Sequence, residues 1–286
     1  MKSYVAKKLI QKFEGQPIFV VGAYRSGTSI LLQALGKHPL ILSAKGEAPL
    51  INFCGNYISK FEDEDKVFNR YLEDSNKVEK QYIYDCFKKL NIEICFGKNY
   101  GFRQLVKTIY YDRFDYFKKK IWSAKVFPDI DSYRGLKYIY PKAKFVYIVR
   151  NGIDVVESRR HFAGFKHESF ETHCHNWTHD SMKFKFFEES EDSAHIYYEQ
   201  LLENPDLFFD KIFDSLSIPK DSSPAKYARG NLIHPLNQKD KRGVDAAKIL
   251  KSRSEPHEKW TDKEKQLFID ICSDEMQYHG YKIPFS

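Results

Sequence analysis

The chain has 286 residues, of which 42% are hydrophobic, and its formal net charge is +7. This content suffices for a full core, whereas a mean hydropathy of −0.57 without a long apolar run argues against a membrane-spanning helix. Residues 1–13 lack the apolar stretch of a secretory signal, and the five cysteines include no C-x-x-C pair. We therefore expect a cytoplasmic protein with reduced thiols.

In chain order, four short apolar runs are predicted to be β-strands, each followed by a helical pattern. They span residues 18–21, 122–126, 145–149 and 194–198. Several lack the polar alternation of a half-exposed sheet, which is typical of parallel strands covered on both faces. We therefore predict a single α/β domain over residues 1–286, with a mainly parallel central sheet and a helical insertion.

Three helices are predicted from their spacing and capping residues. The first follows Gly27, the second opens with Asn204 as N-cap and Pro205 at its first position, and the closing helix spans about 261–279. The side chains expected to face the core are Ile30, Leu31, Ala34 and Leu35 in the first helix, and Leu207, Phe208, Ile212 and Phe213 in the second.

Two segments stand apart from this alternation. Residues 52–120 form an insertion with helical patterning, and it joins strands that we expect to end near Glu47 and Lys125. Residues 219–260, interpreted as a basic loop region, hold ten Lys or Arg against five Asp or Glu. Such an excess indicates either an anionic ligand, such as a nucleotide, nucleic acid or membrane surface, or a solvated basic loop.

The segment GAYRSGTS, residues 22–29, is predicted to bind an anion. It links the first strand to the first helix, so backbone N–H groups and the positive end of the helix dipole should meet there. Both glycines of a Walker A loop, Gly22 and Gly27, are present, but Thr28 replaces its lysine. The hydroxyls of Ser26, Thr28 and Ser29 can donate to an anion. A triphosphate poised for transfer is therefore the weaker interpretation.

A second element, KFVYIVRNGIDVVES, ends its strand in Arg150. In P-loop NTPases a distal strand often ends in an aspartate that holds Mg²⁺, whereas arginine offers a fixed charge and a fork for phosphate oxygens. Ser158 lies about two helical turns further along. We expect arginine to replace magnesium, with no metal required; a salt-bridged arginine and a surface serine are the structural alternatives.

Three segments resemble PAPS-dependent sulfotransferases. PIFVVGAYRSGTSILLQALGKHP is similar to their 5′-phosphosulfate-binding segment, and YPKAKFVYIVRNGIDVVES to their 3′-phosphate-binding segment. HIYYEQLLENPDLFFDKIFDSLSIP is similar to a stretch shared by bacterial and tyrosylprotein sulfotransferases. The resemblance implies a P-loop NTPase-like three-layer fold. It also implies sulfuryl transfer from 3′-phosphoadenosine-5′-phosphosulfate (PAPS) to an acceptor hydroxyl, with adenosine 3′,5′-bisphosphate (PAP) as the product.

The resemblance also implies roles for individual residues. Tyr198 would lie near the nucleotide, although a core tyrosine at a strand end explains it equally well. Arg242, followed by Gly243, resembles a basic-Gly element that covers the 3′-phosphate. The residues implied to hold the 5′-phosphate are Arg25, Ser26, Gly27, Thr28 and Ser29, and those implied to hold the 3′-phosphate are Arg150 and Ser158.

The resemblance implies different catalytic bases, depending on which group of sulfotransferases is compared. Cytosolic sulfotransferases have a K-x-H pattern before proline, but WSAKVFP places Phe127 where the histidine would be, after Lys125. Tyrosylprotein sulfotransferases and some bacterial enzymes instead have a glutamate after the H-P that closes the first helix. Glu47 takes that place here within a shift of one or two residues. A turn carboxylate is the alternative, and His161 or His167 would be the next candidate bases.

In this interpretation Lys125 and Arg25 would stabilise charge on the leaving oxygen and the transferring sulfonate. A further motif, ETHCHNWTHD, carries His173, His175 and His179, but it lacks the carboxylate of a H-E-x-x-H zinc motif. We expect it to be a helix with a solvated histidine face that binds no metal.

Two other functions remain open from the sequence: a P-loop kinase or phosphotransferase, and a nucleic-acid-binding protein. The kinase lacks its lysine and its magnesium carboxylate, and many aromatic residues fall in apolar periodic runs that favour a core over a nucleic-acid interface. The acceptor is left open between a carbohydrate, a lipid-linked sugar, a small molecule and a peptide tyrosine. We expect residues 52–120 to cover the acceptor side; the oligomeric state is not predicted.

Overall fold

The computed structural model describes residues 17–47, 121–140, 142–188, 192–231 and 256–286. The predicted insertion at 52–120 and the predicted nucleotide-binding residue Arg242 lie outside the described residues. Within the described residues, no helix combines the length and the apolar character needed to cross a bilayer.

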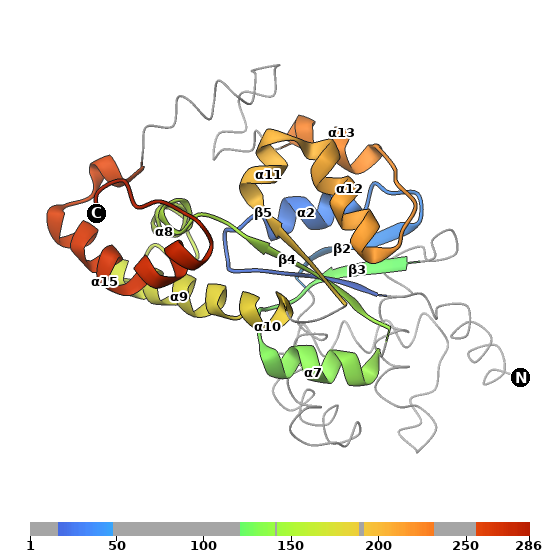
Figure 1. The fold of residues 1–286 in the computed structure, drawn as a ribbon, viewed down its shortest axis with the longest axis horizontal. Coiled ribbons are helices and arrows are strands. Elements are labelled where there is room, and N and C mark those ends of the chain that lie inside the picture. The colour runs from blue at the N-terminus through green and yellow to red at the C-terminus, as the bar shows by residue number, and fades with distance from the viewer. Residues whose placement is uncertain (1–16, 48–120, 141, 189–191, 232–255) are drawn as a thin grey trace, which may run out of the picture. The chain divides into compact units, whose positions relative to one another are not determined.

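The described strands form a five-stranded sheet in the order β2-β3-β1-β4-β5 (Figure 1). β2 runs parallel to β3, and β4 runs parallel to β5. Helices flank this sheet, so the predicted α/β class with a mainly parallel sheet is confirmed. The strands are β1 (Ile18–Val21), β2 (Ile41–Glu47), β3 (Ile121–Lys125), β4 (Lys144–Val149) and β5 (Ser193–Tyr197).

All four apolar runs are strands, with bounds within one residue of the prediction. β2 is not among these runs and is expected only from its end near Glu47, because its sequence ILSAKGE has only two large apolar residues and lacks the run by which the other strands are recognised. It ends at Glu47 and β3 ends at Lys125, as the sequence predicts for the two strands that the insertion joins.

The helices begin where capping residues allow it. In α12 the Asn204 side chain accepts a hydrogen bond from the N–H of Leu207, and Pro205 occupies the first turn. In α15 Thr261 and Glu264 form a reciprocal capping box. The described helices are α2 (Thr28–Leu35), α7 (Ile130–Ile139), α8 (Gly152–Arg160), α9 (Phe170–Met182), α10 (Phe184–Glu188), α11 (Tyr198–Glu203), α12 (Pro205–Leu216), α13 (Ser223–Asn231), the 3₁₀ helix η2 (Pro256–Lys259) and α15 (Asp262–Tyr278).

The chain divides into two compact units, and the first comprises residues 1–19 and 35–144. In its described part, Phe19 and Trp122 pack edge to face with ring centroids 5.5 Å apart, and Tyr140 closes the cluster. β2 and β3 pair in parallel register from Ile41 to Ser43, and an irregularity then precedes the pairing of Glu47 with Lys125.

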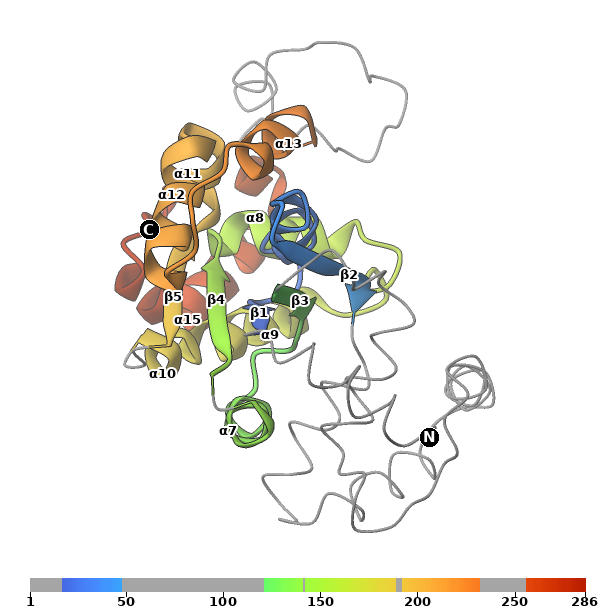
Figure 2. The same cartoon turned by 90° about the vertical axis from the view of Figure 1, so that its right-hand side faces the viewer.

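The second unit comprises residues 20–34 and 145–286. Its strand β4 is buried on both faces: Phe145 and Tyr147 pack against α10, whereas Ile148 lies against the loop that precedes α2. Helices α9 and α15 lie side by side (Figures 1 and 2) and share a core in which Trp177 and Phe268 are fully buried. This second unit contains the predicted phosphate loop and the helix that follows Arg150.

Two expectations about individual segments are wrong. Leu207, expected to face the core, is 67% exposed, because it lies in the first turn of α12 on the face opposite Phe208 and Ile212. Residues 219–260 are not a loop throughout, since they contain α13 and η2.

The two faces of α12 provide a test of the packing. Phe213→Ala should lower the free energy of unfolding by about 3–5 kcal/mol, because it empties a fully buried site. Leu207→Ala, on the exposed face of the same helix, should change it by no more than about 0.5 kcal/mol. Urea denaturation of both variants measures the difference, and equal effects would contradict the assigned faces.

Candidate functional site

The predicted phosphate loop connects β1 to α2 and contains two constrained glycines. At Gly22 an added Cβ would lie 2.4 Å from the carbonyl oxygen of Ile148, so the loop can approach β4 only with glycine there. Gly27 has φ +94°, and an added Cβ would lie 2.4 Å from the Tyr198 ring. Arg25 also adopts a left-handed φ of +74°, which costs a non-glycine residue about 1–2 kcal/mol. Such backbone strain is typical of functional loops.

Arg25 lies at the centre of the polar contacts of this loop. Its Nε donates to Oγ of Ser158 at 3.1 Å, and its backbone carbonyl accepts from Nη1 of Arg150 at 3.1 Å. Its guanidinium lies over the Phe162 ring, 4.5 Å from the centroid. The structure therefore brings Arg25 together with two predicted phosphate-binding residues, Arg150 and Ser158, that lie more than 120 positions later in the sequence.

The second guanidinium of the site, that of Arg150, lies over the Tyr198 ring at 4.6 Å. One of its terminal nitrogens is 3.5 Å from Asp154, which is partly exposed, while its Nε is buried and has no hydrogen-bond partner in the described part of the chain. Burial, followed by the like charge of Arg150, lowers the pKa of Arg25 below the usual value for arginine. Two guanidinium groups held this close favour a bound anion.

The loop hydroxyls differ in their exposure. Ser26 is fully buried and its Oγ has no hydrogen-bond partner among the described residues. Thr28 is also buried, whereas Ser29 is exposed in the first turn of α2. These residues surround the N-terminus of a helix, where the dipole favours negative charge.

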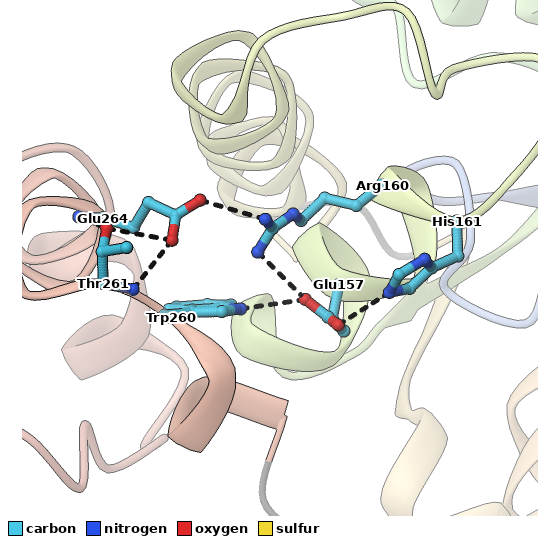
Figure 3. A network of polar contacts seen from close by, with 6 residues as sticks. All are labelled: Glu157, Arg160, His161, Trp260, Thr261 and Glu264. Carbon is cyan, nitrogen blue, oxygen red and sulfur yellow. Dashed lines mark hydrogen bonds and ion pairs between the residues drawn. The ribbon is translucent and has the colours of Figure 1, made fainter.

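Helix α8, which carries Ser158, is fixed by a network around Glu157 (Figure 3). This carboxylate accepts from Nε1 of Trp260 at 2.9 Å and also contacts Arg160, whose other terminal nitrogen donates to Glu264 at 3.0 Å. The network joins α8 to the segment between η2 and α15, so the position of Ser158 depends on residues about 100 positions later.

The turn after α8 is held by a buried arginine. Arg159 donates to Glu168 at 2.7 Å and to Nδ1 of His173 at 3.3 Å. This ties down the turn that places Phe162 over Arg25. His173 is therefore buried, contrary to the expected solvated histidine face, and burial followed by the Arg159 charge lowers its pKa.

The other histidines of the predicted helix behave as expected. His175 and His179 are exposed on α9. His161, an alternative candidate base, is exposed and lies 2.9 Å from a Glu157 oxygen. Across the described residues, no group of three or more His, Cys, Asp or Glu side chains is placed to hold a metal ion.

The two predicted catalytic residues of the first unit occupy paired strand ends. Glu47 and Lys125 are register partners at the carboxyl ends of β2 and β3, the edge at which parallel α/β sheets bind ligands. Phe127, which stands where a histidine base would be, follows two residues after Lys125 and is partly buried.

The family is shown by comparison with known proteins. A sequence model described as "Sulfotransferase family" matches residues 17–222, which is well over half of the chain. The chain belongs to the sulfotransferase family. No curated protein matches the sequence.

Several solved structures of sulfotransferases share its fold. The sulfotransferase domain of the Synechococcus PCC 7002 olefin synthase is 16% identical with a TM-score of 0.58, over 94% of this chain and 96% of that one. The sulfotransferase domain from the curacin biosynthetic pathway is 17% identical with a TM-score of 0.54, over 94% and 99%. Mouse sulfotransferase SULT7A1, solved in complex with PAP, is 14% identical with a TM-score of 0.51, over 92% and 85%. These likenesses show the P-loop-like fold.

Several residues of this candidate site were not anticipated from sequence. Phe162, Glu157 and Trp260 act through contacts between distant segments, and no local spacing marks them. The sequence gives one indirect indication for Glu157: it directly precedes Ser158, on a helix that has Asn151 as its N-cap.

The loop geometry predicts a contrast between two glycines. Gly27→Ala should destabilise the folded protein by at least about 1–2 kcal/mol, because the new Cβ meets Tyr198 and the backbone is left-handed. Gly230→Ala, in α13 with nothing within 4 Å of the added Cβ, should instead stabilise by about 0.5–1 kcal/mol. Thermal unfolding compares them, and a Gly27→Ala variant as stable as wild type would show that the loop is not so constrained.

Proposed function

We propose that this chain transfers a sulfuryl group from PAPS to an acceptor hydroxyl and releases PAP. One observation carries the proposal: Arg25, Arg150 and Ser158 meet beside the N-terminus of α2. Two guanidiniums and a helix N-terminus suit a ligand with more than one phosphate. The PAP bound to the mouse sulfotransferase of similar fold supports the same class of nucleotide.

The chemistry of the available donors fits PAPS. Ser26 Oγ and Arg150 Nε are polar atoms without hydrogen-bond partners in the described residues, and the Arg25 guanidinium lies against Ser158 Oγ and the Phe162 ring. The residues proposed to hold the 5′-phosphate are Arg25, Ser26, Gly27, Thr28 and Ser29, and those proposed for the 3′-phosphate are Arg150 and Ser158, with Tyr198 beside the nucleotide and Arg242 covering it. PAPS itself supplies the activated sulfuryl group.

The proposed catalytic contribution of the chain is electrostatic. Negative charge builds on the leaving phosphate oxygen as its bond to sulfur breaks, and preorganised donors lower the barrier when they face that charge. Arg25 and the N-terminus of α2 provide such donors in the second unit, and we assign the same task to Lys125 in the first. This role requires no metal.

We assign the removal of the acceptor proton to Glu47. It ends a strand in register with Lys125, and Phe127 occupies the position that would otherwise offer a histidine. A carboxylate accepts a proton only in its ionised form, so activity that depends on it falls as the pH drops through its pKa. We propose that the reaction takes place in the cytoplasm, on an acceptor of the carbohydrate, lipid-linked sugar, small-molecule or peptide-tyrosine class.

Isothermal titration calorimetry tests the nucleotide assignment against the kinase and nucleic-acid alternatives. The proposal predicts PAP binding in buffer containing EDTA. ATP binding that requires Mg²⁺, without PAP binding, would overturn it in favour of a kinase. Preferential binding of single-stranded DNA would favour the nucleic-acid alternative.

Arg150→Ala should weaken PAP binding by about 1.5–3 kcal/mol, the usual value of a hydrogen bond to a charged group. Arg134→Ala provides the matched control, because Arg134 is exposed on α7 and its ion pair with Asp131 is long, at 4.0 Å. Calorimetry with PAP measures both. If Arg150→Ala binds PAP as tightly as the control, Arg150 does not belong to the site.

Glu47→Gln should lower turnover by about 10²–10⁴-fold with little change in PAP affinity, because it removes the base but no nucleotide contact. The variant should also lose the acidic limb of the pH–rate profile. Lys125→Met should slow turnover as well, but its profile should keep the acidic limb. Glu203→Gln, at the exposed end of α11, is the control. Wild-type turnover in Glu47→Gln would show that Glu47 is not the base and would direct the search to His161 or His167.

A further inference from the structure

The carboxylate of Glu199 lies outside the proposed nucleotide contacts, yet it reaches the turn that presents Arg150. Glu199 follows Tyr198 at the start of α11. One of its oxygens accepts from the backbone N–H of Asn151 at 3.0 Å, and the other accepts from the hydroxyl of Tyr281 at 2.7 Å. Both oxygens of this carboxylate are therefore used, and neither contact is with a basic side chain.

The environment of Glu199 makes these two hydrogen bonds consequential. Burial raises the pKa of Glu199, while the hydrogen bonds from Asn151 and Tyr281 oppose that shift. A carboxylate in such surroundings depends on its donors, because leaving a buried polar group unpaired is unfavourable. Tyr281 comes from the segment that follows α15, so this contact also ties the C-terminal segment to the turn.

The peptide group between Arg150 and Asn151 is held from both sides. Its N–H donates to Glu199, and its carbonyl oxygen accepts from Nε1 of Trp177 at 3.1 Å. Gly152 lets the indole approach, since a Cβ there would lie 2.9 Å from the ring. Two opposed hydrogen bonds on one peptide group fix the orientation of its plane.

The orientation of that plane determines where the Arg150 side chain can point. Arg150 precedes the fixed peptide directly, and its guanidinium must meet both the Arg25 carbonyl and the Tyr198 face. Glu199 is one residue from Tyr198, so α11 supplies both the ring under the guanidinium and the acceptor that fixes the backbone.

We propose that Glu199, itself held by Tyr281, is a positioning residue that orients Arg150 for the nucleotide 3′-phosphate. The inference rests on the proposed function, because it takes PAP recognition through Arg150 as its starting point. Glu199 acts through the peptide group and touches neither the nucleotide nor the reacting atoms. A merely structural role would lower stability and weaken all nucleotides alike, whereas a positioning role would act only on ligands that carry a 3′-phosphate.

The test compares PAP with adenosine 5′-monophosphate, which lacks the 3′-phosphate, by calorimetry. Glu199→Gln should weaken PAP about tenfold and leave adenosine 5′-monophosphate within about twofold, because an amide can accept only one of the two hydrogen bonds. Tyr281→Phe removes a single hydroxyl, so the variant should still fold. It should lower the affinity for PAP relative to adenosine 5′-monophosphate about threefold. Glu203→Gln, at the exposed end of the same helix, should retain the wild-type preference.

A double variant adds a readout that a general loss of stability would not produce. Glu199→Gln combined with Arg150→Ala should bind PAP no more weakly than Arg150→Ala alone, since the two act on one contact. Additive losses, or wild-type preference for PAP in both Glu199→Gln and Tyr281→Phe, would overturn the inference alone. A wild-type chain that does not prefer PAP would overturn the proposed function and the inference with it.

Discussion

The contact between the Arg25 side chain and Ser158 is the interaction on which the second unit depends. It joins the phosphate loop to α8 through a hydrogen bond of 3.1 Å from Arg25 Nε to Ser158 Oγ. The Arg25 carbonyl oxygen in turn accepts a hydrogen bond from Nη1 of Arg150. A cluster of two guanidiniums is unfavourable in isolation, because like charges repel and burial removes their hydration. The surrounding structure therefore has to hold these groups in place. An anion would relieve the repulsion, which is why the arrangement supports a phosphate ligand.

The second unit holds this cluster by fixing both ends of α8. At the N-terminal end, Trp177 and Glu199 fix the peptide that follows Arg150. At the C-terminal end, the Glu157 carboxylate accepts a hydrogen bond from Nε1 of Trp260, which lies between η2 and α15 (Figure 3). Most of these anchors come from segments after residue 170, so residues far from the phosphate loop in sequence determine the geometry of the nucleotide site.

The sequence sufficed to predict the fold wherever a local pattern carries the information. Apolar runs marked four strands, and Asn204 with Pro205 marked the start of α12. β2 was not recognised from its own pattern, because ILSAKGE contains no apolar run. Leu207 was assigned to the wrong face of α12, because a short apolar run fits more than one helical face. The candidate phosphate-binding residues followed from motifs, whereas Phe162 and Glu199 contribute through tertiary contacts that no spacing records.

Metal-independent sulfuryl transfer would appear as movement of labelled sulfur from PAPS to an acceptor. The protein would be incubated with ³⁵S-labelled PAPS and a mixed panel of carbohydrate, lipid-linked sugar, phenolic and peptide-tyrosine acceptors in EDTA, with products resolved by mass. Our account predicts a labelled acceptor and an equal amount of PAP with the wild type, and loss of both with Arg25→Ala. Phosphate transfer from ATP that requires Mg²⁺, without transfer of sulfur to any acceptor, would contradict it.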